Sequence, residues 1–212
     1  MKIKEESFTI VLIGNWNRHI LSPNWISKEI FLEDKITVEF SLNLELPPRY
    51  TSPTSHIRIL PSSSNVTFVA LGSDDSCLNK MEKMTQALLE KLPYTPIKAF
   101  GINFGYIESI EKSDLYNIFK FSDTDRLGQE RYLIKSSALQ RSLIVEDRVL
   151  NLNISTNDTE VSFDFNFHYD VSNAKDAIDK ITSNAVTNKI IAEKILSNVY
   201  KLSFDSVAEE TQ

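Results

Sequence analysis

The sequence predicts an α+β protein in which two pseudo-repeats of β-α-β-β-β-α form a mainly antiparallel curved sheet, with two long helices packed on one face. Three observations support this prediction. Some segments alternate with period two, as strands with one buried face do, and others repeat apolar residues three and four apart, as helices do. Both kinds of segment follow the same order in each half of the chain. We expect residues 1–94 to form the first repeat, residues 95–204 the second, and residues 205–212 a disordered tail.

The first half begins with a β-rich run over residues 8–13, which Gly14 closes. Ser22 and Pro23 then predict the start of a short helix, because Ser is a favourable N-cap and Pro suits the first helical position. Residues 36–44 alternate apolar and polar side chains, which predicts a strand with one face toward the core.

A loop is expected next, over residues 47–53, because it is rich in proline. Two short strands follow at residues 56–60 and 66–71. Residues 72–75 then introduce a long helix whose apolar stripe continues to Leu92.

The second half repeats this order. Its expected elements are a strand at 97–106, a short helix at 113–121, a long strand or bent pair at 131–145, and strands at 148–155 and 160–171. Ser172 is the expected cap of the longest helix, which runs from residue 173 to about residue 201. A break is compatible with the sequence near Ser183 and Asn184.

A fixed offset relates the first elements of the two halves. Gly14 aligns with Gly105, and Ser22 aligns with Ser113, both at an offset of 91 residues. The later elements drift to an offset near 98, so the second half needs an insertion, and the polar residues 123–130 provide room for it as a loop.

The order β-α-β-β-β-α, taken twice, is similar to the saddle of the TATA-box-binding-protein-like (TBP-like) fold. That resemblance implies a curved sheet with helices on its convex side and a concave binding face. DNA-binding members of the fold are basic across the saddle and insert Phe wedges. Here the candidate strand faces carry Glu39, Asp164 and Asn166, with few cations beyond Lys135 and Arg141. We therefore carry over the fold, and nucleic-acid binding is not expected.

Composition limits the class of protein. Hydrophobic residues make up 42% of the 212 and charged residues 25%, which is typical of a folded globular chain. The net charge of −6 opposes binding to phosphates. A single cysteine, Cys77, favours a reducing compartment, and no segment is apolar enough to span a bilayer, so we expect a cytoplasmic protein without a membrane partner. Cys77 itself is expected to be a small buried residue rather than a reactive thiol.

Motifs for catalysis or cofactors are not found. No glycine-rich phosphate-binding motif is present, and the three histidines, His19, His56 and His168, lack metal-ligand spacing. We therefore assign no catalytic residue, no metal and no cofactor. His168 is expected to face solvent, and Gly101 and Gly105 are expected to mark a bulge or bend in a strand.

The best candidate binding residues are Trp16, Arg18 and His19, which lie in a polar and aromatic loop between a strand and a helix. Trp and Arg are frequent anchors of protein interfaces. In the alternative interpretation, Trp16 closes the edge of the core while Arg18 and His19 are merely solvated.

These observations favour a non-catalytic protein-binding or assembly module, as a homo-oligomer or as part of a larger prokaryotic or phage-derived complex. The alternative is a small apolar-ligand-binding or enzyme domain of helix-grip or hot-dog type. An enclosed cavity between sheet and helix would distinguish it. Nucleic-acid binding is the third hypothesis.

Overall fold

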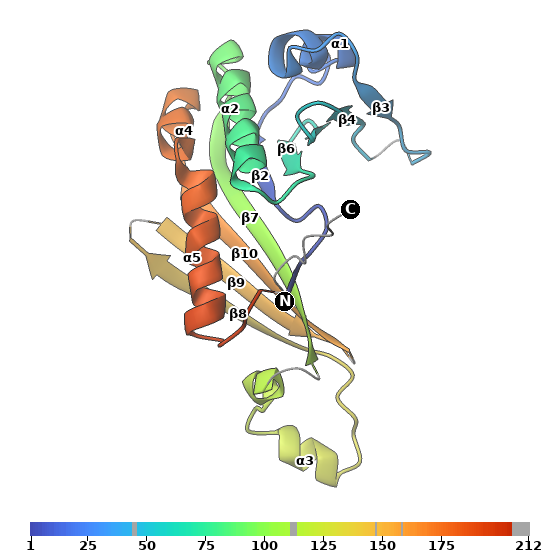
Figure 1. The fold of residues 1–212 in the computed structure, drawn as a ribbon, viewed down its shortest axis with the longest axis vertical. Coiled ribbons are helices and arrows are strands. Elements are labelled where there is room, and N and C mark those ends of the chain that lie inside the picture. Colours follow the sequence, from blue (N-terminus) through green and yellow to red (C-terminus); the bar gives the residue numbers. More distant parts are fainter. Residues whose placement is uncertain (44–45, 111–113, 147, 158, 205–212) are drawn as a thin grey trace, which may run out of the picture.

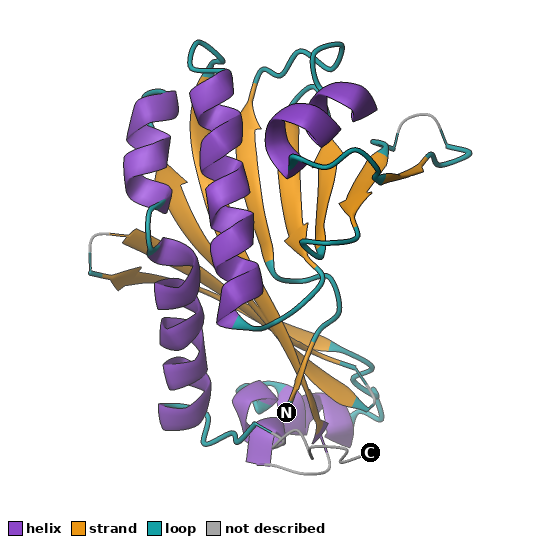
Figure 2. Ribbon diagram, turned by 45° about the horizontal axis from the view of Figure 1, so that its top comes forward, coloured by secondary structure: helices purple, strands orange, loops and turns teal. Residues whose placement is uncertain are grey.

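The computed structural model describes residues 1–43, 46–110, 114–146, 148–157 and 159–204. The chain is α+β, with a ten-stranded antiparallel sheet and a layer of helices on one of its faces (Figures 1 and 2). The predicted class and the mainly antiparallel sheet are confirmed. The tail that we expected at residues 205–212 lies outside the described residues.

The strands run in the order β3-β4-β5-β6-β2-β7-β10-β9-β8, and β1 pairs with β7 off this path. Their bounds are β1 Lys2–Ile3, β2 Thr9–Gly14, β3 Thr37–Glu39, β4 Arg49–Ser52, β5 Ile57–Pro61, β6 Asn65–Ala70, β7 Ile97–Ser109, β8 Ser137–Val145, β9 Arg148–Thr156 and β10 Glu160–Asp170. β7 is long enough to pair with β2 along its first part and with β1 along its last, so it lies at the centre of the sheet.

The helices are shorter and more numerous than expected. They are α1 Pro23–Ile26, the π-helix η1 Ser27–Phe31, α2 Asp75–Lys91, the 3-10 helix η3 Asp114–Phe119, α3 Thr124–Gln129, α4 Ala174–Ile181 and α5 Asn184–Asn198. Helices α2, α4 and α5 cover the sheet, whereas α3 lies at the far end of β7 (Figure 1). The predicted N-cap Ser22 is confirmed, because its Oγ accepts a hydrogen bond from Trp25 N at 3.4 Å.

The core lies between the sheet and these helices. The five alternating side chains of β10 are all buried on the helix side, as the alternation predicted: Val161, Phe163, Phe165, Phe167 and Tyr169. Phe100 of β7 stacks on Tyr169 with the ring centroids 4.4 Å apart, and Phe104 packs edge to face against Phe167. Aromatic rings therefore fill the centre of the layer.

The long C-terminal helix is broken into α4 and α5 at the predicted place. Ser183 has a φ of 61°, which interrupts helical geometry. The predicted cap Ser172 is wrong by one residue. Asn173 is the N-cap, and its Oδ1 accepts a hydrogen bond from Asp176 N at 3.0 Å. The hydroxyl of Ser172 bonds instead to the carboxylate of Asp176.

The strand predicted at residues 36–44 is wrong at residues 40–43, and residue 44 lies outside the described residues. β3 pairs with β4, which forms in the predicted loop, and Glu39 is the last paired residue, opposite Arg49. The next residues of the partner are Pro48 and Pro47, which have no N–H to donate to a ladder. The alternating residues after Glu39 therefore leave the sheet instead of packing on the core.

Three predictions in the second half need correction. Residues 123–130 are not a plain loop, because α3 forms within them. The strand predicted from residue 131 begins only at Ser137, and the helix predicted at 113–121 is the 3-10 helix η3. Its expected cap, Ser113, lies outside the described residues.

No bulge lies at Gly101 or Gly105, because the β7–β10 register runs unbroken past both. The register shift lies between Ile13 and Gly14. Glycine is needed in β7 for close packing instead: a Cβ on Gly101 would lie 2.6 Å from Asn166 Nδ2, and one on Gly105 would lie 2.7 Å from Ser7 Cβ.

Candidate protein-binding site

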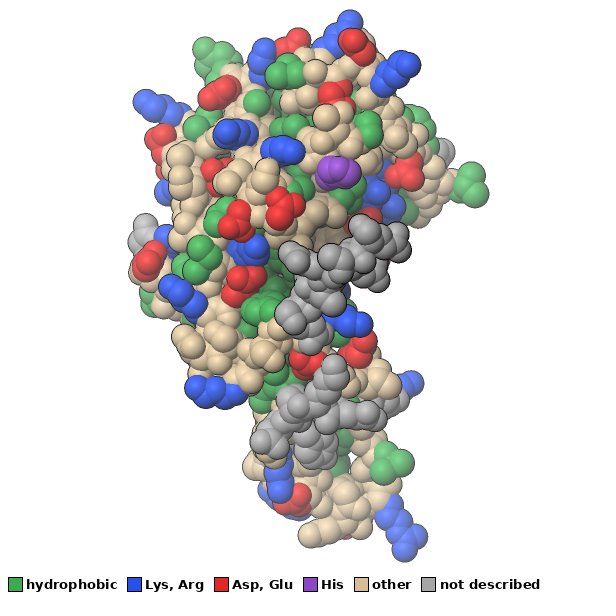
Figure 3. Space-filling view, viewed as in Figure 1, with side chains coloured by type: hydrophobic (Ala, Val, Ile, Leu, Met, Phe, Trp, Pro, Cys, Tyr) green, Lys and Arg blue, Asp and Glu red, His purple; other side chains and the backbone are tan. Residues whose placement is uncertain are grey.

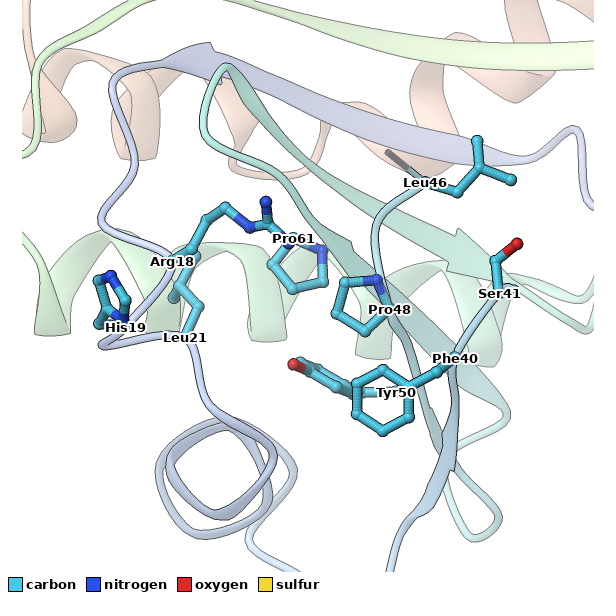
Figure 4. A pocket seen from close by; sticks show the side chains of 9 residues that line it. All are labelled: Arg18, His19, Leu21, Phe40, Ser41, Leu46, Pro48, Tyr50 and Pro61. Atoms are coloured by element: carbon cyan, nitrogen blue, oxygen red, sulfur yellow. The ribbon is translucent and has the colours of Figure 1, made fainter. Parts of the chain in front are cut away.

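A pocket of about 360 Å³ opens where the β2–α1 loop faces the connection between β3 and β4 (Figure 4). The loop contributes Arg18, His19 and Leu21. We call residues 40–43 and 46–48 the arm, and its Phe40 and Leu46 line the opposite side. The pocket is thus built from segments far apart in the sequence.

Local hydrogen bonds hold the loop in place. The amide side chain of Asn17 accepts from His19 N at 3.0 Å, and Asn17 O accepts from Ile20 N at 3.1 Å, which closes a tight turn. Trp16 is buried, and its Nε1 donates to Leu12 O at 3.3 Å. Trp16 therefore anchors the loop in the core, while Arg18 and His19 are exposed at its outer side.

The structure separates the three predicted binding residues. Arg18 and His19 line the same pocket, whereas Trp16 does not line it. For Trp16 the geometry matches the interpretation in which its ring closes the edge of the core. Arg18 and His19 are exposed and line a pocket, so a ligand bound there could contact both side chains.

The pocket walls are largely aromatic and apolar. The Tyr50 ring of β4 is buried and the Phe40 ring is exposed, and both line the pocket together with Pro48 and Pro61 (Figure 4). Burial raises the pKa of the Tyr50 hydroxyl, although the nearby positive charge of Arg18 acts in the opposite direction. Arg18 and these aromatic side chains therefore line one pocket.

Among the described residues that line this pocket, Arg18 is the one that carries a fixed charge. No ion pair or side-chain hydrogen bond joins it to another described residue, so its donors are available. An unpaired guanidinium beside apolar walls suits a ligand that joins an apolar group to a carboxylate.

The arm exposes further apolar side chains beside the pocket. Phe40 is 74% exposed, Leu46 is 53% exposed, and Leu42 is fully exposed to solvent. Neighbouring exposed apolar side chains of this size are typical of contact surfaces rather than of a random surface.

The other candidate residues are not brought to this site. His168 is half-buried, and its Nε2 lies 3.2 Å from Asp170 Oδ1. Cys77 is buried, as predicted, and burial raises the pKa of its thiol. Within the described ranges, no three His, Cys, Asp or Glu side chains come together as a metal-binding group.

The open face of the sheet carries a feature that our sequence reasoning missed. A row of cross-strand partners is linked in one direction: Ser142 Oγ to Asn151 Oδ1 at 2.8 Å, Asn151 Nδ2 to Asn166 Oδ1 at 3.2 Å, Asn166 Nδ2 to Asn103 Oδ1 at 2.6 Å, and Asn103 Nδ2 to Thr9 Oγ1 at 2.9 Å. The signal was present in the sequence, because these residues occupy the positions that alternate with the buried Phe residues. We call this set the amide row.

Charge on the molecule is mixed in sign. On the open face, Lys4 Nζ pairs with Asp164 Oδ1 at 3.1 Å beside the amide row. On the side seen in Figure 3, Lys and Arg side chains are interspersed with Asp and Glu rather than gathered into a stripe. This view shows no basic footprint of the kind that nucleic-acid binding needs.

No protein-family model matches the chain, and no curated protein matches its sequence. Across the described residues, no helix combines the length and the apolar character that crossing a membrane requires.

Proposed function

We propose that this protein is a non-catalytic protein-binding or assembly module, and that it holds a segment of a partner protein in the pocket around Arg18. The observation that carries the proposal is the pairing of an unpartnered guanidinium with aromatic and proline walls in one pocket. Arg and aromatic side chains dominate the binding energy of protein interfaces.

The chemistry of the pocket defines the segment. An apolar side chain suits the walls that Phe40, Pro48 and Tyr50 contribute, and a carboxylate next to it suits the guanidinium of Arg18, which lines the same pocket. The exposed side chain of Leu42 extends the contact along the arm. The partner segment is therefore an apolar residue followed or preceded by an acidic group.

The alternative function, binding of a small apolar ligand between sheet and helix, has weaker support. Fully buried side chains occupy the space where such a ligand would lie, among them Phe8, Phe68, Phe100 and Leu78. The pocket at Arg18 lies instead at the edge of the sheet, where a protein segment can reach it.

We also propose that residues 1–94 and 95–204 are two β-α-β-β-β-α pseudo-repeats of TBP-like topology. The strand order supports this. Outward from the centre, β2 is followed by β6, β5, β4 and β3, while β7 is followed by β10, β9 and β8. In each half the strand at the centre, β2 or β7, therefore lies beside the last strand of that half, although the first half has one strand more on its side. A cytoplasmic location is also proposed, on the ground of the lone, buried Cys77.

Selection from a displayed library of random peptides tests the binding function. We expect the enriched peptides to share an aromatic or aliphatic residue adjacent to Asp or Glu. Arg18→Glu should weaken their binding by about tenfold or more, because it replaces an attraction by a repulsion. Phe40→Ser should weaken it as well, by removing a wall of the pocket.

Matched control variants separate the pocket from general surface effects. Arg126→Glu makes the same charge change on α3, and Leu133→Ser removes an apolar side chain that is 95% exposed. Both should bind the selected peptides as the parent does. The proposal fails if no peptide is enriched, or if the pocket variants and the control variants bind alike.

A further inference from the structure

The two edges of the sheet differ in how well they are protected. At one edge, β3 is three residues long, and its last pair sets Glu39 opposite Arg49, so charge and shortness discourage further pairing. At the other edge, β8 has nine residues and pairs with β9 in unbroken register from Ser137 to Val145. No described strand pairs with its outer side.

The sequence of β8 lacks the residues that usually protect an edge. It contains no proline and no lysine, and its single charged residue is Arg141. On the open face Ile144 is 86% exposed, and on the helix side Leu139 and Leu143 are only half-buried against the core. A further strand beside β8 would cover these apolar side chains.

The amide row also reaches this edge. Ser142 is its last member, and its hydroxyl donates to Asn151. A hydroxyl that donates one bond retains two acceptor lone pairs. Beyond Ser142 the row ends in solvent, since Ser142 is exposed.

We propose that a second copy of this chain covers the edge, with its β8 antiparallel to this β8 about a two-fold axis at Ser142. In this register Ser142 lies opposite the partner's Ser142, and Leu139 lies opposite the partner's Val145. Gln140 is then diagonal to the partner's Ser142, within the reach of a long side chain, and supplies a donor to its free acceptors.

Charge excludes the register centred one residue earlier, on Arg141. If the two-fold axis lay at Arg141, the two Arg141 guanidinium groups would lie directly opposite each other on one face of the sheet. Like charges at such positions are destabilising. Pairing about Ser142 sets Arg141 opposite the partner's Leu143 instead. The axis also joins the two amide rows end to end, so one polar row crosses both subunits.

The inference specifies the self-association that the proposed function allows, yet it uses none of the pocket residues. A purely monomeric chain would refute it and leave the peptide result at Arg18 untouched. Failure of peptide binding would likewise leave the dimer intact.

Sedimentation of the full chain over a dilution series tests the proposal. We expect a dimer, and we expect S142K to raise its dissociation constant about fivefold or more, because the axis sets the two new ammonium groups opposite each other. S142A removes the hydroxyl without adding charge and should keep most of the dimer. T37K places a lysine on the opposite edge, at an exposed position of β3, and should leave the dimer unchanged.

Mixing two variants separates the register from damage to the fold. S142K and S142E should each dimerise poorly alone and form a heterodimer when mixed, since the axis then brings opposite charges together. A parent chain that stays monomeric overturns the proposal. So does a dimer that S142K does not weaken, or a pair of variants that gains nothing on mixing.

Discussion

Glu82 of α2 connects the two main helical segments, and its removal gives a quantitative test of the fold. Its carboxylate is buried and accepts two backbone hydrogen bonds at the start of α5, from Ser183 N at 2.7 Å to Oε1 and from Ala185 N at 3.0 Å to Oε2. A side chain from a distant helix therefore provides the cap that Ser183 does not provide for its own helix.

Glu82→Ala should lower the free energy of unfolding by about 3 kcal/mol. One hydrogen bond to a charged group contributes about 1.5–3 kcal/mol, and the loss of both bonds is less than additive because one carboxylate makes them. For a chain of this size, 1 kcal/mol shifts the melting temperature by about 2–4 °C, so the expected drop is about 6–12 °C. Glu82→Gln keeps one acceptor oxygen, so its free energy of unfolding should lie between those of the parent and of Glu82→Ala.

Urea unfolding followed by circular dichroism measures this change, with Glu90→Ala as the matched control. Glu90 is an exposed glutamate on the same helix, and its replacement should stay within about 0.5 kcal/mol of the parent. Hydrogen exchange at Ser183 and Ala185 provides a local readout. The reasoning is refuted if Glu82→Ala and Glu90→Ala unfold at the same urea concentration, or if these two amides keep their protection.

Two further predictions concern groups inside the fold. Burial raises the pKa of the Glu193 carboxyl, although the positive charge of Lys189 acts in the opposite direction. The folded state therefore favours the neutral acid. This contribution to stability is present at low pH and is lost as the pH rises through the pKa of the folded state. The Glu193→Gln side chain stays neutral, so this variant should be more stable than the parent at pH 8. The difference should vanish near pH 4, where the parent carboxyl is protonated as well. Urea unfolding measures this, and midpoints that differ equally at both pH values would contradict it. Gly101→Ala should cost about 1–2 kcal/mol, because its Cβ displaces Asn166 from the amide row. In an Asn166→Ala background most of that cost should disappear. A double-mutant cycle without coupling would show that the contact between the Cβ of residue 101 and Asn166 does not cause the loss of stability.

Strands that are hydrogen-bonded to a neighbouring strand on both sides could be predicted from the sequence. In β10, alternation alone identifies the buried face from Val161 to Tyr169, because neighbours on each side satisfy its backbone. The same alternation misled at residues 40–43. There the partner offers Pro48 and Pro47, and a hydrophobic pattern cannot form a strand without a donor opposite it.

The candidate site could be predicted only in part. Loop position identified Arg18 and His19, and both line the pocket. Trp16 could not be separated from them by sequence, because an exposed anchor and a core ring look alike in a loop. The opposite wall, with Phe40, depends on the arm leaving the sheet. That follows from the proline-limited ladder and not from any local signal at the loop.

The positions of the two proposed surfaces in the strand order have a consequence for assembly. The pocket at Arg18 lies by β3 and β4, at one end of the sheet, whereas β8 is the other end. A dimer joined at β8 therefore keeps both pockets free and sets them at the two outer ends of one continuous sheet. Two identical sites held apart on a rigid support favour a partner that offers two copies of its segment, because the second contact then forms within the complex. Joining the subunits at β3 instead would bring the pockets together and place each arm against the neighbouring subunit. The unprotected edge is thus the one whose pairing leaves peptide binding unobstructed.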